Sequence, residues 1–513
     1  MLHRTQPAGP DATERRAALR TLAGLGLGLA LPGAQAYPGP LALKGLPTPE
    51  LLKYQPVMPP ALQELVSASQ LPESSFGLHA VPVDGRGQPL VSLNAELPFQ
   101  LASTTKVVTS LAALDLLGPQ YRWRTYAFIT APITDGKLLG DLLIVGGGDA
   151  SLSTDELRQW FAVLRKQGLQ EVWGDIILDR FAFRFQPTDH VGTPEPTPMR
   201  PHHALPDAFT LDEGVLRVAV HGRAESAPDI TLTPPMEGLR VVNEVRPGRG
   251  CTAAVSVERE EGESRVLVRG QWAAGCGSRE LAHLALPHEE FTVHAISALW
   301  RDCGGKLKGR VLDKRLPDRV AGVPMDAKGK PLAPFSVHQS SALPVVIRDI
   351  NKTSDNMAAR NLLLSLAQGF PQKAATLPDA RARLAQWLKR QGLQPGDIEV
   401  DNGSGLSRAE RGKPRALVQL LRNAWHASQG KTFFDSLPVA GVDGTLANRM
   451  NESAAAGRAF LKTGTLADTR ALAGYVKSLG GRMYAVVAII NHVDAPHHTA
   501  ALDAMIDWTV RQG

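Results

Sequence analysis

Three short motifs in this chain carry the side chains that an acyl-transfer reaction requires. In chain order they are Ser103 with Lys106, Ser354 with Asn356, and the segment Lys-Thr-Gly-Thr that begins at Lys462. A serine hydroxyl can attack a carbonyl carbon, and a nearby lysine can take its proton. A second serine with an amide can orient a peptide and pass on a proton, while a cationic segment can bind a carboxylate. The combination predicts a serine acyl-transfer site.

Each motif by itself has a more ordinary structural interpretation. Ser103 could cap a helix that carries a solvated lysine, residues 354–356 could cap another helix, and residues 462–464 could form a turn. Matches to patterns this short also arise by chance in a chain of 513 residues. The order of the three motifs and the local context of each favour the catalytic interpretation.

The context of Ser103 is the start of a predicted helix. Apolar residues recur at helical spacing between residues 102 and 117. Ser103 then lies in the first turn, where backbone N–H groups lack intrahelical partners and the helix dipole favours negative charge. Lys106 lies one turn further along the same face. This arrangement would stabilise an alkoxide at the serine and an oxyanion beside it.

The second motif is predicted to form a turn between two helices. Residues 354–356 fall between helical patterns at residues 343–351 and 357–369. A short turn exposes its side chains well, so Ser354 and Asn356 are expected to point into a cleft.

The third motif is predicted to lie on a β-strand. Lys462 precedes two strand-like runs, residues 471–476 and 483–490, which places it on a strand beside them. The small residues after it would let a substrate backbone approach closely, and Gly464 avoids a Cβ at the tightest point.

Taken together, the motifs resemble those of the penicillin-recognising serine enzymes. The interval between Lys106 and Ser354 is much longer than a β-lactamase needs, whereas the interval between Asn356 and Lys462 is ordinary. This pair of intervals is similar to that of one branch of these enzymes. This branch is the class C low-molecular-mass penicillin-binding proteins, which are D-alanyl-D-alanine carboxypeptidases and endopeptidases. Four further segments are similar to this family, so the resemblance spans nearly all of the exported chain: residues 146–149, 351–352, 401–408 and 441–446.

The resemblance implies a role for each residue of the first two motifs. Ser103 would be acylated, and Lys106 would act as the general base. Ser354 would relay a proton, and Asn356 would orient the substrate amide.

The resemblance also implies how the third motif would hold a substrate. Lys462, Thr463 and Thr465 would bind the terminal carboxylate, with Gly464 in the same substrate-binding segment. The backbone N–H groups of Ser103 and Thr465 would form the oxyanion hole. The implied partners are peptidoglycan stem peptides as substrates and β-lactam antibiotics as inhibitors, with no cofactor and no metal.

The role of Lys106 places a physical requirement on its surroundings. A free lysine has a pKa of about 10.4, so a base that works near neutrality needs a pKa of about 7, a difference worth about 4 kcal/mol. Burial of Lys106 and the second cation Lys462 across the same cleft would both disfavour the charged form. We expect the two lysines to be coupled.

Two other functions compete with a D,D-peptidase. A β-lactamase shares the acylation step but needs a group that activates water for rapid deacylation, and no Glu-x-x-x-Asn segment lies between the second and third motifs. A catalytically idle penicillin-binding sensor would require a transmembrane connection, which no apolar run in the sequence provides.

The predicted fold is a multidomain α+β fold. The resemblance implies a β-lactamase/transpeptidase-like domain, an antiparallel sheet flanked by helices, whose two parts are residues 37–120 and 325–513. Between them, residues 121–324 contain short apolar runs separated by Gly and Pro turns, which predicts a β-rich insertion of two subdomains.

The N-terminus is typical of an export signal. Arg15 and Arg16 precede an apolar run at residues 22–31, and a small-x-small cleavage site ends at Ala36. Residues 1–36 are therefore predicted to be a signal peptide that is cleaved after Ala36, which places the mature protein in the periplasm.

Composition sets further limits on partners. The net charge of +6 would permit loose attraction to peptidoglycan or to a membrane surface. The absence of a nucleic-acid motif and an aromatic content of 5% argue against nucleic-acid binding, and the oligomeric state is left open.

The chain contains three cysteines. In an oxidising compartment Cys251 and Cys276 could form a disulfide that closes a hairpin-sized loop, which would leave Cys303 free. None of the three has a neighbouring histidine or a ligand spacing that would favour thiol catalysis or zinc.

Overall fold

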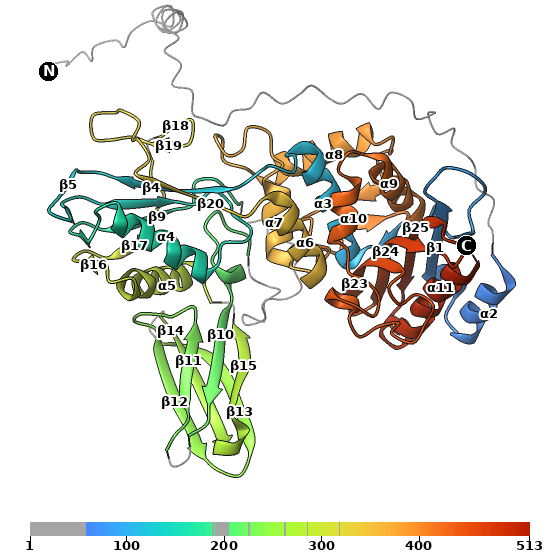
Figure 1. Cartoon of the computed structure of the whole chain (residues 1–513), viewed down its shortest axis with the longest axis horizontal. Helices are drawn as coiled ribbons and strands as arrows, with labels where there is room; N and C mark the ends of the chain where they lie inside the picture. The colour runs from blue at the N-terminus through green and yellow to red at the C-terminus, as the bar shows by residue number, and fades with distance from the viewer. Residues whose placement is uncertain are drawn as a thin grey trace, which may run out of the picture. The chain divides into compact units, whose positions relative to one another are not determined.

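The structure, a computed structural model, describes residues 58–186, 189, 205–223, 226–260, 263–284, 286–317 and 319–512. The predicted signal peptide at residues 1–36 lies outside these ranges. Within them the fold is the predicted mixture of helices and mainly antiparallel sheets (Figure 1). No helix in the described part of the chain is long and apolar enough to cross a membrane.

A five-stranded antiparallel sheet brings the two ends of the described chain together. Its strand order is β2-β1-β25-β24-β23, so the N-terminal hairpin pairs with the C-terminal strands. The bounds of its strands are β1 Phe76–Pro82, β2 Val91–Leu93, β23 Ala459–Leu466, β24 Thr469–Lys477 and β25 Met483–Asn491.

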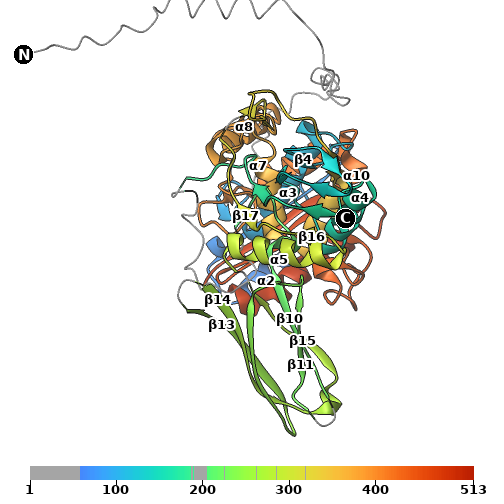
Figure 2. The same ribbon diagram turned by 90° about the vertical axis from the view of Figure 1, so that its left-hand side faces the viewer.

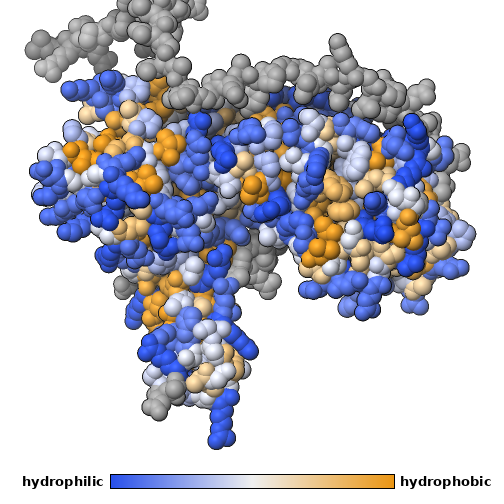
Figure 3. All heavy atoms as spheres, viewed as in Figure 1, coloured by the Kyte–Doolittle hydropathy of each residue, from blue (hydrophilic) through white to orange (hydrophobic). Residues whose placement is uncertain are grey.

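The two faces of this sheet pack against different sets of helices. Along β25, Ala485, Val487 and Ile489 contribute to one buried cluster, whereas Val486 and Ala488 contribute to another. This alternation follows from the two-residue period of a strand. The first cluster includes apolar side chains of α3 (Thr105–Leu116), α6 (Leu343–Thr353) and α9 (Pro414–His426). The second includes those of α2 (Pro60–Ala68) and α11 (Thr499–Gln512). On the face seen in Figure 3, hydrophilic side chains predominate and hydrophobic residues form small separate groups.

The described residues include the helices that apolar periodicity predicts at residues 102–117, 343–351 and 357–369, together with helices at residues 60–68, 288–302 and 430–436 that were not predicted. The helix bounds are α2 Pro60–Ala68, α3 Thr105–Leu116, α4 Thr154–Lys166, α5 His288–Asp302, α6 Leu343–Thr353, α7 Asn356–Leu364, α8 Leu377–Arg390, α9 Pro414–His426, α10 Gly430–Ser436 and α11 Thr499–Gln512.

Most of the remaining strands lie between α3 and α6 in the sequence. They form a five-stranded sheet of order β17-β9-β7-β4-β20, a four-stranded sheet of order β16-β8-β6-β5, and two three-stranded sheets of orders β11-β10-β15 and β12-β14-β13. The two three-stranded sheets run side by side in Figures 1 and 2. The strand bounds are β4 Arg124–Ile129, β5 Ile133–Thr134, β6 Lys137–Leu138, β7 Leu142–Val145, β8 Glu171–Val172, β9 Ile176–Asp179, β10 Leu216–His221, β11 Asp229–Thr233, β12 Arg240–Pro247, β13 Cys251–Glu260, β14 Glu263–Trp272, β15 Ser278–Leu284, β16 Lys306–Leu307, β17 Val311–Asp313 and β20 Ser336–Gln339.

Three small pairings complete the list of strands. A two-stranded hairpin consists of β18 Arg319–Val320 and β19 Val323–Pro324, and a three-stranded sheet of order β21-β22-β3 consists of β3 Phe99–Gln100, β21 Ile398–Glu399 and β22 Arg411–Gly412.

The pairing of strand β20 indicates where the inserted region ends. Ser336–Gln339 lies beyond the boundary expected at residue 324, yet it pairs with β4, the first strand after α3. We propose that the inserted region ends after Gln339 and that α6 begins the second part of the larger domain. The short and partly exposed β20 carries no local pattern that would reveal its partner.

The disulfide between Cys251 and Cys276 is present, with a Cα–Cα distance of 5.7 Å, and Cys303 is free. Cys251 is the first residue of β13, and the short turn Ala274–Cys276 follows β14. The bridge therefore ties together the open ends of two paired strands.

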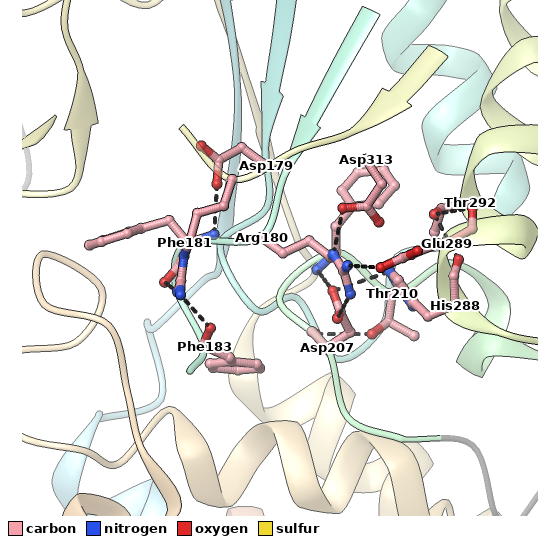
Figure 4. Close-up of polar contacts among 12 residues, drawn as sticks. Asp179, Arg180, Phe181, Phe183, Asp207, Thr210, His288, Glu289, Thr292 and Asp313 are labelled. Atoms are coloured by element: carbon pink, nitrogen blue, oxygen red, sulfur yellow. Dashed lines mark hydrogen bonds and ion pairs between the residues drawn. The ribbon is translucent and has the colours of Figure 1, made fainter. Parts of the chain in front are cut away.

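A polar network around Arg180 links several parts of the inserted region (Figure 4). The guanidinium donates from Nε to Asp313 Oδ1 over 2.9 Å and from Nη1 to Asp207 Oδ2 over 2.8 Å. A third contact, of 3.5 Å, reaches Glu289 at the start of α5. The backbone carbonyl of Asp207 also accepts a hydrogen bond of 2.9 Å from Asn361 in α7. The network therefore connects the inserted region to the helix that begins at the second motif.

We expect Arg180→Met to reduce the free energy of unfolding by about 3 kcal/mol, because it leaves two buried carboxylates without their cation. The side chains of Asp207 and Asp313 are only 8% and 9% exposed. Urea unfolding of the mature protein measures this loss. Arg158→Met is the matched control: its partner Asp155 is 82% exposed, so the expected change is within about 0.5 kcal/mol. Equal losses in the two variants would contradict the expectation.

Candidate active site

Ser103 lies in a single turn of 3-10 helix, Ala102–Thr104, which leads directly into α3. The helix predicted at residues 102–117 is therefore present, with a more tightly wound first turn. Glycines from two distant segments pack against this turn. A Cβ at Gly405 would lie 2.0 Å from the carbonyl oxygen of Ala102, and one at Gly464 would lie 2.8 Å from that of Leu101. The nucleophile turn is thus held closely between backbone from both sides.

Lys106 is fully buried beneath this turn and contacts three oxygen atoms. Its Nζ lies 3.0 Å from Ser103 Oγ, 2.7 Å from Asn356 Oδ1 and 2.5 Å from the carbonyl oxygen of Ser404. The contact with Asn356 joins the first and second motifs. The contact with Ser404 lies within the segment at residues 401–408.

The turn between α6 and α7 joins the second motif to the third. Ser354 ends α6 in the left-handed conformation, with φ of 65°, and Asn356 begins α7, so the predicted inter-helix turn is present. Lys462 lies on β23, as predicted, and is fully buried. Its Nζ donates to Ser354 Oγ over 2.9 Å and to the carbonyl oxygen of Thr463 over 2.8 Å. One short turn therefore contacts both buried lysines.

The remaining residues of the third motif lie along the same strand. Thr463 is 8% exposed, and its hydroxyl donates to Thr445 Oγ1 over 2.8 Å, whereas Thr465 is exposed. Gly464 lies against the nucleophile turn, where its lack of a Cβ permits the close approach of Leu101 and Ala102.

Two of the segments noted for their family resemblance meet beside Thr463. Lys352 donates to both carboxylate oxygens of Asp443 over 2.6 Å and to the carbonyl oxygen of Leu437 over 2.7 Å. This ion pair fixes the loop that presents Thr445 to the third motif. Thr445 belongs to the segment at residues 441–446, to which the sequence alone assigned no role.

The electrostatic environment favours a neutral Lys106. Burial lowers the pKa of Lys106 to about 7, an effect that Asp355 and Glu410 oppose and Arg360 assists. Burial also holds the pKa of Lys462 well below its usual range, and repulsion from Lys106 adds to this.

The predicted effect of Lys462 on Lys106 is not found; the neighbouring cation that lowers the pKa of Lys106 is Arg360. Repulsion between the two lysines acts in the opposite direction, because Lys106 lowers the pKa of Lys462. The two lysines are therefore coupled, as predicted.

The described residues include no group of three or more His, Cys, Asp or Glu side chains that could hold a metal ion. The group that contacts Ser103 Oγ is the amine of Lys106.

An α+β fold that assembles Ser-x-x-Lys, Ser-x-Asn and Lys-Thr-Gly around one serine defines a penicillin-recognising serine hydrolase of the class C low-molecular-mass type. The chain belongs to the D-Ala-D-Ala carboxypeptidase 3 (S13) family of peptidases, whose family model matches residues 60–512. This membership confirms the resemblance seen in the motifs and makes the chain a hydrolase of the D,D-peptidase kind.

Individual relatives agree with the family assignment. The D-alanyl-D-alanine carboxypeptidase of Actinomadura sp. (strain R39) is 29% identical over 460 residues, which cover 87% of this chain and 81% of that protein. The D-alanyl-D-alanine carboxypeptidase DacB of Haemophilus influenzae is 25% identical over 431 residues, which cover 82% and 86%.

The crystal structure of penicillin binding protein 4 (dacB) from Haemophilus influenzae shares the fold. Its TM-score is 0.71 at 23% sequence identity, and the match covers 88% of this chain and 99% of that chain. A second structure of that protein, complexed with a β-lactam, has a TM-score of 0.66 at 22% identity.

Proposed function

We propose that this protein is an exported serine D,D-peptidase that acts on peptidoglycan peptides in the periplasm. It removes the terminal D-alanine of stem peptides and opens D-alanyl cross-links through an acyl-enzyme on Ser103, and β-lactams acylate the same serine. The observation that carries this proposal is the environment of Lys106, whose Nζ lies 3.0 Å from Ser103 Oγ and which has a pKa of about 7.

The hydrogen bonds of Lys106 give the amine a defined orientation. A neutral amine has two hydrogens and one lone pair. Two of the three contacts, Asn356 Oδ1 and the Ser404 carbonyl, can only accept hydrogen bonds. The two hydrogens are therefore committed to them, and the lone pair faces Ser103 Oγ. A neutral Lys106 is thus oriented to accept the hydroxyl proton as the serine attacks.

The proposed reaction has two acyl-transfer steps. Ser103 Oγ bonds to the carbonyl carbon of the penultimate D-alanine while Lys106 takes the hydroxyl proton. The C–N bond then breaks, and the leaving amine receives a proton by way of Ser354. Water hydrolyses the ester and restores the serine. The backbone N–H groups of Ser103 and Thr465 would stabilise the oxyanion in both steps.

The third motif would bind the terminal carboxylate of the substrate. Lys462 is buried and carries a depressed pKa in the free enzyme. A bound carboxylate would favour the protonated amine, so we infer that Lys462 takes up a proton as the substrate binds. Thr463 and Thr465 add hydroxyl donors along the same strand.

A product analysis tests the proposed function. The purified mature protein is incubated with monomeric and with cross-linked muropeptides, and the products are weighed by mass spectrometry. We expect loss of one D-alanine from the former and separation into two peptides in the latter. A sample pretreated with benzylpenicillin is the control and should give neither product.

The same protein with fluorescent penicillin separates the alternatives. A stable label with slow release supports the D,D-peptidase, and rapid hydrolysis of the drug would favour a β-lactamase. Failure of the wild-type protein to become labelled would contradict the proposed function and favour a catalytically idle binding module.

A further inference from the structure

Glu410 is a fully buried carboxylate that closes a loop next to the active site. Its Oε1 accepts hydrogen bonds from the backbone N–H groups of Asp401 (3.2 Å), Asn402 (2.9 Å) and Gly403 (2.6 Å), and its Oε2 accepts one from Gly405 (2.6 Å). Charge-assisted hydrogen bonds of this kind are short and strong. One side chain therefore fixes almost every amide of the loop at residues 401–405, which we call the Glu410 loop.

The Glu410 loop lies directly against the nucleophile and its base. The one residue of the loop whose amide Glu410 leaves free is Ser404, whose carbonyl oxygen accepts a hydrogen bond from Lys106. On the α3 side, Thr109 donates to the carbonyl of Gly403 over 2.8 Å. On the other side, a Cβ at Gly405 would lie 2.6 Å from the backbone nitrogen of Ser103. A small shift of the loop would therefore move an acceptor of Lys106.

We propose that Glu410 is a positioning residue for the acylation of Ser103: its carboxylate holds the Glu410 loop so that the Ser404 carbonyl takes one hydrogen of Lys106. This inference rests on the proposed role of Lys106 as the general base. Without the Ser404 acceptor, the amine can rotate about its last bond, and its lone pair no longer points only at the serine.

The charge of Glu410 adds a second, separable effect. The charged groups that act on Lys106 are Asp355 and Glu410, which favour its protonated form, and Arg360, which disfavours it. Arg360 and Arg381 are the other cations that Glu410 influences. Burial raises the pKa of Glu410, and its backbone N–H partners oppose this. Removing the negative charge should therefore lower the pKa of Lys106.

Two variants distinguish position from charge. Glu410→Gln removes the charge and replaces one acceptor by a donor that faces backbone N–H groups. We expect its limiting acylation rate constant to fall by about 10-fold to 100-fold, as for a misplaced catalytic group. The midpoint of its acidic limb should also move down by about one pH unit. Glu410→Asp keeps the charge but is too short for all four amides, so its rate should fall while its midpoint stays at the wild-type value.

The measurement is the rate of labelling by fluorescent penicillin between pH 5 and 9, normalised to the amount of labelled enzyme at saturation. The midpoint does not depend on the fraction of protein that is folded, so a poorly folding variant still reports it. Asp397→Asn is the matched control: this carboxylate is also buried and holds Lys413 and Arg415, and both rate and midpoint should remain unchanged.

The outcomes separate the inference from the function on which it rests. If the wild-type protein is not labelled at all, the proposed function fails. If it is labelled and Glu410→Gln keeps the wild-type rate and midpoint, the inference fails and the function stands. A lower rate with an unchanged midpoint in Glu410→Gln, as a general loss of structure would produce, also overturns it. If Glu410→Gln gives no soluble protein, a wild-type rate in Glu410→Asp overturns it.

Discussion

Ser103→Ala is expected to form no covalent adduct with fluorescent penicillin and to lose hydrolysis of D-alanyl-D-alanine peptides by about 10⁵-fold or more. The reason is that Ser103 Oγ is the hydroxyl oxygen that contacts the amine of Lys106, and alanine leaves no nucleophile at this position. The substitution removes one oxygen atom from a turn that is held by backbone contacts, so the fold should persist.

The covalent label on SDS gels and the mass of the intact protein after incubation with benzylpenicillin measure this effect. Ser110→Ala is the matched control, because Ser110 is a buried serine of α3 that lies outside the site. It should be labelled at the wild-type rate. A stoichiometric adduct on Ser103→Ala would show that a different residue is acylated.

The second large effect is expected for Lys106→Met, which keeps an unbranched apolar chain but removes the base. Loss of a general base costs about 10² to 10⁴ in rate, so acylation should fall by about 10³-fold. In the wild-type protein the rate should rise with pH through a midpoint near the pKa of Lys106, about 7, because only the neutral amine can take the serine proton.

The acidic limb is the more informative readout. Since the folded-state pKa of Lys106 is depressed, the active form is present above the midpoint and is lost as the pH falls through it. Lys106→Met should lose this limb together with the rate. Lys166→Met, at an exposed lysine that ends α4, should retain both. Persistence of a midpoint near pH 7 in Lys106→Met would assign the limb to another group.

Much of this fold and site could be predicted from local patterns. The helical repeat after Ser103 and the strand-like apolar runs of β24 and β25 depend on a few neighbouring residues, and these predicted elements are present. The motif residues could also be identified from the sequence, because their chemistry resides in side chains at short spacings.

The features that could not be predicted involve backbone atoms or residues that lie far apart in the sequence. Ser404 contributes a carbonyl oxygen, which every residue has, and Glu410 acts through backbone amides, so neither leaves a compositional sign. The pairing of β20 with β4 joins residues more than 200 positions apart without a local signal. The direction of the coupling between the two lysines depended on their relative burial and partners, which spacing does not report.

Helix α7 contacts both the active site and the inserted region, so substitutions in either part can affect the other. Its first residue, Asn356, contacts Lys106, and Asn361 one turn later binds the backbone of Asp207 in the inserted region. A shift of α7 caused by a substitution in the inserted region would therefore also move Asn356, the residue that contacts Lys106. Substitutions that alter the response to an antibiotic need not fall near the acylated serine, and sequencing of the motifs alone would overlook them.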